Sequence, residues 1–185
     1  MAGYYPSCEE IVVAHDCDPC TDKEYGRIRS AAYIRSDYVD TILADPDNAT
    51  LWAAGQNDDL KIIVIPKTHG EFIEPSEIVG QGYGDQLDEL ISYDQSMRYF
   101  DPNFINNCDF YNEIKRTRNY HGVFRTSSRI YITQVPVTVI PKMIVADDLG
   151  SVVEWNVLWK WRYQDFACPY DVPTGIFDAC FIPNT

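Results

Sequence analysis

Cysteine and histidine side chains gather near the start of the chain, in the stretch SCEEIVVAHDCDPCTD at residues 7–22. Cys17 and Cys20 form a Cys-x-x-Cys pair, which can hold one zinc ion if Cys8 and His15 supply the other two ligands. The sequence has no second pair of this kind, although a strong zinc signature has two. Three interpretations stay open: inert structural thiols, a structural metal site, or a redox pair or disulfide.

The aspartates that flank this pair argue against a reactive thiol. Asp16, Asp18 and Asp22 place negative charge beside Cys17 and Cys20. Such charge raises a thiol pKa and disfavours the thiolate that redox chemistry needs. We therefore expect the cluster to pin an N-terminal arm to the rest of the chain, by packing or through one metal ion.

Other stretches that look like chemical motifs lack essential parts. GQGYGDQ at residues 80–86 lacks the Lys-Ser/Thr ending of a phosphate-binding loop. DPDNATLWAAGQ at residues 45–56 begins like a calcium loop, but it lacks the glycine at its sixth position and ends in glutamine instead of glutamate. His69 and His121 stand apart from any nucleophile motif. We expect a protein that is not an enzyme.

Length and charge limit the domain number and the classes of partner. A chain of 185 residues suits one domain, and we expect an N-terminal arm at residues 1–24 and a single β-rich domain at residues 25–185. The formal net charge of −13 argues against nucleic acid, which needs a basic face. Residues 1–6 lack a signal-peptide pattern, and the aliphatic runs are too short to cross a bilayer. We therefore expect production in a cytoplasm and no membrane partner.

The clearest predicted element is a strand over residues 151–163, SVVEWNVLWKWRY. Large apolar side chains occupy its odd positions, among them Trp155, Trp159 and Trp161, while the even positions are mostly polar. A period of two predicts a strand with one buried face. Because buried tryptophans contribute large apolar areas, this strand should lie at the centre of the core.

Further strands and two helices complete the predicted fold. The other strands are predicted over residues 27–34, 61–65, 89–100, 120–125 and 129–140, the last as a pair or a strand bent at Pro136. The main helix is predicted near residues 103–116, with Asp101 as its N-cap and Cys108 on its apolar face. A short helix follows Pro46 and ends at Gly55. The chain is therefore predicted to be mainly β: an antiparallel β-sandwich or barrel with one main α-helix and a short second helix.

Aromatic and aliphatic side chains outside the predicted core indicate contacts with other proteins. The chain holds 13 tyrosines and 4 tryptophans, which are enriched in protein interfaces. Residues 68–86, THGEFIEPSEIVGQGYGDQ, are predicted to form a long loop, and loops of that length are usually functional or disordered. We predict that interface side chains lie in this loop and in an aromatic terminal arm: Tyr4, Tyr5, Phe72, Ile73, Ile78, Val79 and Tyr83.

Several long stretches together carry a resemblance to known proteins. They are CDPC, YGRIRSAAYI, ILADPDNATLWAAG, KIIVIPKTHGEF, GYGDQLDELISYDQSMRYFDPNFINNCDFYNEIKRTRNYHGVFRT, VPVTVIPKMIVADDLGSVVEWNVLWKWRYQD and YDVPTGIFD. The pattern over residues 17–178 resembles virion structural proteins of tailed bacteriophages, particularly the crAss-like phages of gut bacteria. No short diagnostic motif defines this group, so the resemblance rests on the overall pattern.

The resemblance implies assembly as the function. It implies an oligomeric ring or lattice subunit of the neck, tail or capsid, made in the host bacterial cytoplasm and retained in the virion. Copies of itself and other virion proteins would be its partners, with no catalytic residue and no cofactor. Two alternatives stay open: a zinc-stapled protein-binding module, and a carbohydrate-binding β-sandwich that uses exposed tryptophans. The even face of residues 151–163 has no tryptophan, which disfavours the second.

Overall fold

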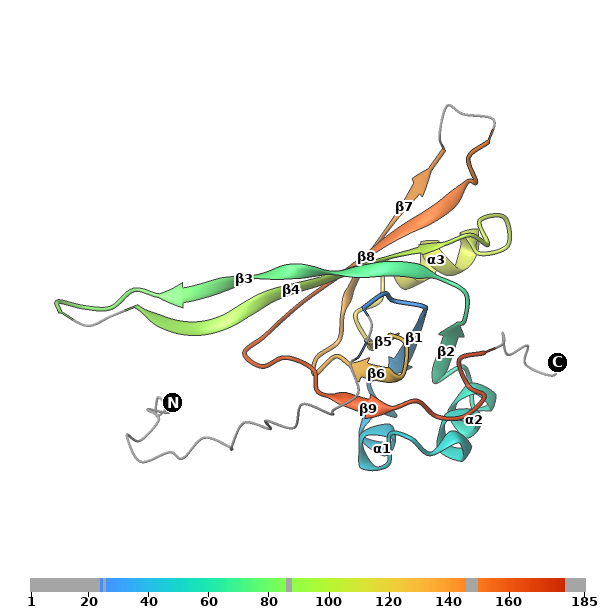
Figure 1. The fold of residues 1–185 in the computed structure, drawn as a ribbon, viewed down its shortest axis with the longest axis horizontal. Helices are drawn as coiled ribbons and strands as arrows, with labels where there is room; N and C mark the ends of the chain where they lie inside the picture. Colours follow the sequence, from blue (N-terminus) through green and yellow to red (C-terminus); the bar gives the residue numbers. More distant parts are fainter. Residues whose placement is uncertain (1–23, 25, 86–87, 146–149, 179–185) are drawn as a thin grey trace.

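The computed structural model describes residues 24, 26–85, 88–145 and 150–178. Its strands form two antiparallel sheets, one in the order β2-β1-β5-β6-β9 and one in the order β3-β4-β8-β7 (Figure 1). The prediction of a mainly β, sandwich-like protein is confirmed. The elements are β1 (Ser30–Arg35), α1 (Val39–Ala44), α2 (Ala49–Asn57), β2 (Ile62–Ile65), β3 (His69–Gly80), β4 (Glu89–Asp101), α3 (Cys108–Ile114), β5 (Tyr120–Arg125), β6 (Arg129–Ile132), β7 (Thr138–Ile144), β8 (Glu154–Tyr163) and β9 (Pro169–Asp171).

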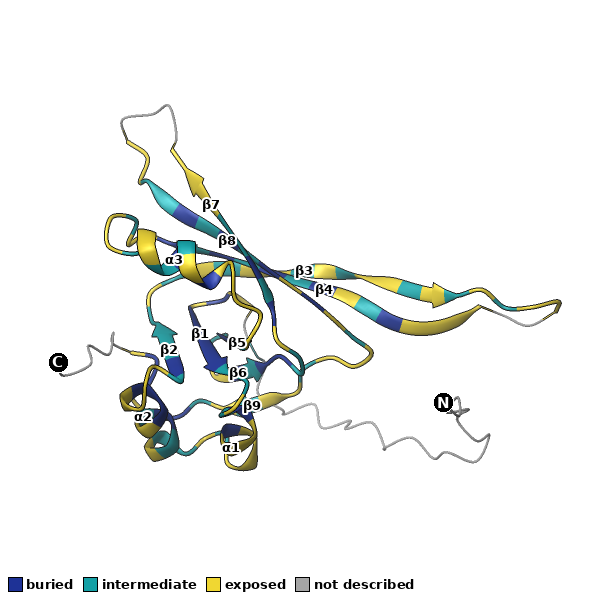
Figure 2. Ribbon diagram, turned by 180° about the vertical axis from the view of Figure 1, so that it is seen from behind, coloured by how far each residue is buried: buried dark blue, intermediate teal, exposed yellow. Residues whose placement is uncertain are grey.

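Strand β8 belongs to the four-stranded sheet, and its inward face forms the centre of the core that lies between the two sheets. Trp155, Val157, Trp159 and Trp161 are all buried on one face of β8, as the period of two predicts. They pack against side chains of the five-stranded sheet, such as Tyr33 of β1, whose ring centroid lies 5.0 Å from that of Trp159. In Figure 2 the buried residues concentrate where the sheets overlap, and exposed residues increase toward the ends of the projecting hairpins.

The other face of the five-stranded sheet carries a second core. Ala32 and Ile34 alternate with Tyr33 along β1 and therefore point away from the first core. They share an apolar cluster with α1, α2 and the segment after β9. Within it, Trp52 of α2 is fully buried and donates a hydrogen bond from Nε1 to the carbonyl oxygen of Pro46 at 2.8 Å. The described residues thus form three layers: the helices α1 and α2, the five-stranded sheet and the four-stranded sheet.

A chain of buried polar groups ties both sheets to α3. Trp159 Nε1 donates to the Tyr33 hydroxyl at 2.9 Å, and that hydroxyl lies 2.7 Å from the hydroxyl of Tyr99. The hydroxyls of Tyr99 and Tyr111 are 3.3 Å apart, and Tyr111 donates to Oδ2 of Asp101 at 2.8 Å. Burial raises the pKa of all three tyrosines above the usual value, so their hydroxyls stay protonated. The series of hydrogen bonds therefore acts as a structural element.

The prediction of a loop over residues 68–86 is wrong for most of that segment. The structure has the strand β3 there, and β3 pairs with β4 in a long hairpin. Most side chains of β3 are exposed or half-buried on both faces, so the sequence lacks the alternation that marks a half-buried strand. Pro75 is tolerated because the register shifts between Ile73 and Ser76, at a bulge where a ladder hydrogen bond is not required.

Helix α3 is shorter than the predicted helix at residues 103–116. It begins after Asn107, which occupies the N-cap position. Asp101, predicted as the N-cap, instead ends β4, and its buried carboxylate accepts hydrogen bonds from Asn103 N and Asn107 Nδ2, both at 2.9 Å. The chain turns around this carboxylate before the helix starts. Cys108 is exposed, so its predicted place on the apolar face is wrong.

The stretch at residues 129–140 contributes strands to both sheets. β6 belongs to the five-stranded sheet, whereas β7 forms an edge of the four-stranded sheet. Pro136 lies in the connection between them, where no ladder hydrogen bond is needed. The prediction of a strand pair is thus correct, but the two strands do not pair with each other.

The helical layer differs from its prediction in two respects. α1 was not expected, and α2 runs past Gly55, which therefore does not end the helix. A Cβ atom on Gly55 would lie 2.6 Å from Tyr38 Cε1 and 2.7 Å from Ile62 Cδ1. The glycine is needed because α2 packs closely on these side chains.

Candidate functional site

A two-stranded ribbon extends from the sandwich, and we call residues 74–85 and 88–92 the arm. β8 pairs with β4 only over Tyr93–Asp101, so the part of β4 before Tyr93 pairs with β3 alone. In Figure 1 this ribbon projects far beyond the rest of the described chain. A two-stranded hairpin alone is marginally stable in water. The arm therefore depends on its root, where β4 joins the four-stranded sheet.

Apolar side chains are exposed along the arm. Of the predicted interface residues, Ile78 is half-buried, Val79 is 52% exposed and Tyr83 is 85% exposed. Sequence reasoning missed Leu90 and Ile91, which are 49% and 57% exposed. Leu90 lies directly opposite Val79 in the ladder. Leu90 and Ile91 were overlooked because an apolar pair in a strand normally indicates core.

Phe72 and Ile73 lie at the root of the arm, on opposite faces of β3. The Phe72 ring centroid lies 5.9 Å from those of Phe124 and Trp161, so this residue belongs partly to the core. It also borders an apolar hollow of about 290 Å³ between the sheets. Ile73 lies opposite Ser96 on the outer face. The two predicted interface residues therefore border different surfaces.

The described part of the arm is acidic. It holds Glu74, Glu77, Asp85, Asp88 and Glu89, which are all exposed, and it holds no lysine or arginine. None of these carboxylates forms an ion pair with a described residue. The arm thus combines exposed apolar side chains with uncompensated negative charge.

Exposed basic side chains gather near the end of α3, and we call four of them the basic surface: Lys115, Arg116, Arg118 and Lys160. Arg118 and Lys160 border the same groove, although one follows α3 and the other belongs to β8. Among the described carboxylates, none forms an ion pair with any of the four. Lys115 donates only to the side chain of Asn112, at 2.7 Å.

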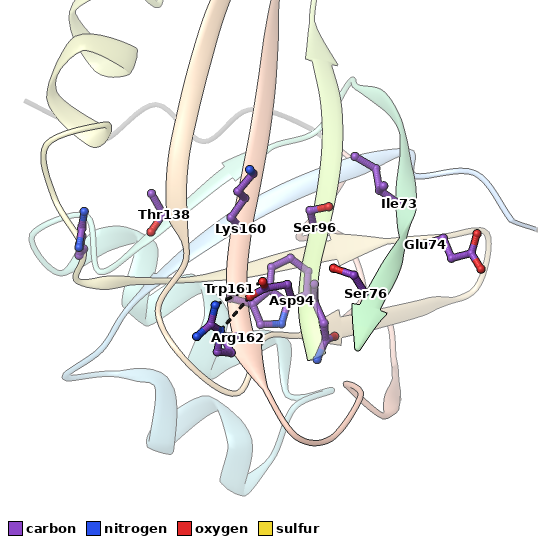
Figure 3. Close-up of a pocket in the computed structure, with 11 residues that line it drawn as sticks. Ile73, Glu74, Ser76, Asp94, Ser96, Thr138, Lys160, Trp161 and Arg162 are labelled. Carbon is purple, nitrogen blue, oxygen red and sulfur yellow. Dashed lines mark hydrogen bonds and ion pairs between the residues drawn. The ribbon is translucent and has the colours of Figure 1, made fainter. Parts of the chain in front are cut away.

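An open groove of about 810 Å³ lies on the outer face of the four-stranded sheet. Figure 3 shows Ser96, Lys160 and Thr138 on neighbouring strands along it, with Arg162 turned toward Asp94. Arg162 Nε donates to Asp94 Oδ1 at 2.8 Å, and this hydrogen bond holds the pKa of Asp94 below its usual value. A groove this open and polar suits an extended protein segment better than a small molecule, which is usually bound in an enclosed apolar cleft.

The carboxylate of Glu24 binds the turn between β5 and β6. It accepts hydrogen bonds from Ser127 Oγ and Ser128 N, both at 3.0 Å, and from the hydroxyls of Thr126 and Ser128. These bonds, led by that from the Ser128 side chain, lower the pKa of Glu24 to about 2. Glu24 thereby fastens the start of the described chain to the five-stranded sheet.

Substitution Glu24→Gln is expected to flatten the acid dependence of stability. The folded pKa of about 2 lies below the ordinary value of 4.5, so the ionised carboxylate stabilises the fold above pH 4.5 and loses this effect as the pH falls toward 2. Thermal unfolding followed by circular dichroism between pH 7 and pH 2 measures this. The midpoint should fall more steeply for the wild type than for Glu24→Gln, with Glu113→Gln as the exposed control. Parallel curves for wild type and Glu24→Gln would contradict the assignment.

Six of the predicted site residues fall outside the described residues: Tyr4, Tyr5, Cys8, His15, Cys17 and Cys20. Within the described ranges, no group of three or more His, Cys, Asp or Glu side chains is placed to hold a metal ion. Cys108 and Cys168 are exposed free thiols. No described helix is long and apolar enough to cross a membrane.

The described residues thus present three surfaces suited to protein contacts: the acidic arm, the groove at its root and the basic surface. Two of the predicted interface residues, Val79 and Tyr83, are strongly exposed on the arm. No known protein family, curated protein or solved structure matches this chain.

Proposed function

We propose that this chain is a non-enzymatic virion structural protein, an oligomeric ring or lattice subunit in the tail, neck or capsid of a tailed phage. The resemblance over residues 17–178 supports this function. The observation that carries it is the arm, a ribbon that leaves the sandwich with Val79, Leu90 and Ile91 about half exposed. Such an element adds little to a monomer's own core and is suited to reach a neighbouring subunit.

The energetics of the arm favour a bound state. Apolar side chains collected on an exposed element commonly mark a contact with another protein. Burying the exposed half of Val79 and of Leu90 would contribute on the order of 1 kcal/mol each. Several such side chains on one ribbon give a modest free energy of binding at one contact. The total is substantial when the contact is repeated around a closed ring.

The carbohydrate-binding alternative lacks its aromatic platform. It requires tryptophans exposed on a sheet face, but all four tryptophans are buried, with exposed fractions between 0% and 7%. Three of them face inward from β8, and Trp52 lies in the helical core. This observation favours the assembly function over sugar binding.

Shortening the arm is expected to abolish assembly without unfolding the sandwich. Residues 79–91 are replaced by Asn-Gly, which joins Ile78 to Ser92, two residues that already face each other in the ladder. The wild type should form oligomers in size-exclusion chromatography with light scattering, and rings or sheets in negative-stain images. The shortened variant should be monomeric, with an unchanged far-ultraviolet spectrum per residue of the sandwich.

A pair of double variants separates the arm's side chains from its length. Val79→Ser/Leu90→Ser should weaken assembly, whereas Leu43→Ser/Leu60→Ser should not, because Leu43 and Leu60 are exposed on the opposite, helical side. Assembly that survives in the shortened variant would refute the role of the arm. A wild-type chain that stays monomeric and also fails to join phage particles would refute the proposed function.

A further inference from the structure

We propose that the arm of one copy docks on the basic surface of a second copy, so that identical subunits join head to tail. This inference rests on the proposed function and names its partner and its mode of contact. The described chain carries both halves of the contact: an acidic ribbon without cations, and four exposed cations that form no ion pair with a described carboxylate.

Charge complementarity is the first argument. The sequence from residue 68 to residue 97 contains seven Asp and Glu residues and no Lys or Arg. The segment at residues 115–118 is Lys-Arg-Thr-Arg, with three cations in four positions. In a chain with a net charge of −13, a local basic cluster next to the groove is the surface on which an acidic ribbon is attracted rather than repelled.

Geometry places the two halves in different molecules. In Figure 1 the free end of the arm and α3 lie on opposite sides of the sandwich, so the distal arm does not reach its own basic surface. A contact between two different patches of identical subunits is heterologous. Repetition of such a contact closes into a ring when the rotation allows and otherwise continues as a filament.

The groove provides room for the docked ribbon. Arg118 and Lys160 border it, and it is open to solvent along the outer face of the four-stranded sheet (Figure 3). Val79 and Leu90 face each other in the ladder, and Glu77 lies two residues before Val79 on the same strand, so a carboxylate and two apolar side chains share one face of the arm and would dock together. The charges would set the position of the ribbon, and the apolar side chains would exclude water from the contact.

Side-chain docking fits the chain better than pairing of free sheet edges. The two edge strands of the four-stranded sheet are β3 and β7, and each contains a proline, Pro75 and Pro141. Proline cannot donate a ladder hydrogen bond, and prolines on edge strands hinder the addition of another strand. We therefore expect the contact to depend on side-chain charge, which charge reversal can test.

The experiment reverses charge on each half of the contact. The arm variant is Glu77→Lys/Glu89→Lys, and the surface variant is Arg116→Glu/Arg118→Glu. Each alone should raise the dissociation constant of self-association by about tenfold or more, because like charges then face each other. An equimolar mixture of the two should recover oligomers, since each arm then meets a surface of opposite charge. A single chain with all four substitutions should recover them as well.

Analytical ultracentrifugation at fixed ionic strength measures these states. Fixed salt matters because salt screens both the local attraction and the repulsion between subunits of charge −13. Asp40→Lys/Asp47→Lys, on the helical side, changes the net charge as much as the arm variant does and should leave association unchanged. It controls for net charge, and unfolding curves of all variants control for folding.

Three results would overturn the inference. One is an arm variant that associates like the wild type. Another is a mixture that fails to recover although both variants are folded. The third is a wild-type chain that is monomeric at its highest attainable concentration. If that monomer nevertheless joins phage particles, the proposed function stands and the arm binds a different virion protein; if it does not, both proposals fail.

Discussion

Replacing Trp159 by alanine is expected to lower the free energy of unfolding by about 3–5 kcal/mol. The side chain is fully buried, and its ring centroid lies 5.0 Å from that of Tyr33 and 5.4 Å from that of Tyr99. On its other side the ring lies against Gly122 of β5, where a Cβ atom would be 2.5 Å from Trp159 Cζ3. Alanine would leave a cavity between the two sheets. The sheets cannot approach each other to fill it, because ladder hydrogen bonds fix their backbones. Urea unfolding followed by circular dichroism measures the loss.

Trp159→Phe separates volume from hydrogen bonding at the same position. Phenylalanine fills part of the space but removes the Nε1 donor to the Tyr33 hydroxyl. We expect a loss of about 1–3 kcal/mol, smaller than that of alanine. A loss below about 1 kcal/mol for Trp159→Ala would mean that the core collapses around the gap, and the central role of this residue would be wrong.

Replacing Asp101 by alanine is expected to lower the free energy of unfolding by about 3–5 kcal/mol, because three donors lose their acceptor. The carboxylate is 2% exposed and accepts hydrogen bonds from Asn103 N, Asn107 Nδ2 and the Tyr111 hydroxyl. Without it, all three donors lose their acceptor, and the hydrogen bond from the Tyr111 hydroxyl is a buried one. The turn between β4 and α3 should lose its order together with the hydroxyl chain. Urea unfolding gives the free energy, and hydrogen exchange of α3 amides shows where order is lost.

Two further variants show whether this cost arises at the buried carboxylate. Tyr111→Phe removes one donor and leaves the carboxylate two others, so we expect a loss of about 1 kcal/mol. Asp109→Ala removes an exposed carboxylate at the start of α3 and should change stability by at most about 0.5 kcal/mol. Equal effects of Asp101→Ala and Asp109→Ala would contradict the role of Asp101 as an organising acceptor.

The sandwich was predictable mainly from β8, which has one buried face and one mostly polar face. β8 alternates tryptophan with polar residues, and the structure buries those tryptophans as the pattern requires. β2 was also identifiable, as a short apolar run that ends before Pro66, and β5 coincides with the strand predicted over residues 120–125. The assignment of strands to sheets was not predictable, because nothing local in residues 129–140 reveals that β6 and β7 belong to different sheets.

The strand β3 of the arm was not predicted, because prediction of a strand relies on an alternation between buried and exposed positions. A strand with no buried face has no alternation, and glycine and proline in β3 resemble the punctuation of a loop. Helix α3 was misjudged at its start because Asp101-Pro102 has the composition of a helix N-terminus, yet the carboxylate is used inside the core. Of the predicted interface residues, Val79 and Tyr83 are exposed on the arm, and the exposure of Leu90 and Ile91 became evident only once the hairpin was known.

The way in which the arm is rooted has a mechanical consequence. A pull on the tip of the arm acts along β4, which is held to β8 from Tyr93 to Asp101. Hydrogen bonds of an antiparallel ladder lie across the strands, so this pull loads them together in shear and does not peel them apart one by one. Tension at the tip therefore passes into the tryptophan-lined core as a whole. In the proposed assembly, a subunit joined to its neighbour through the arm would resist extension better than one whose strands are unzipped from an end.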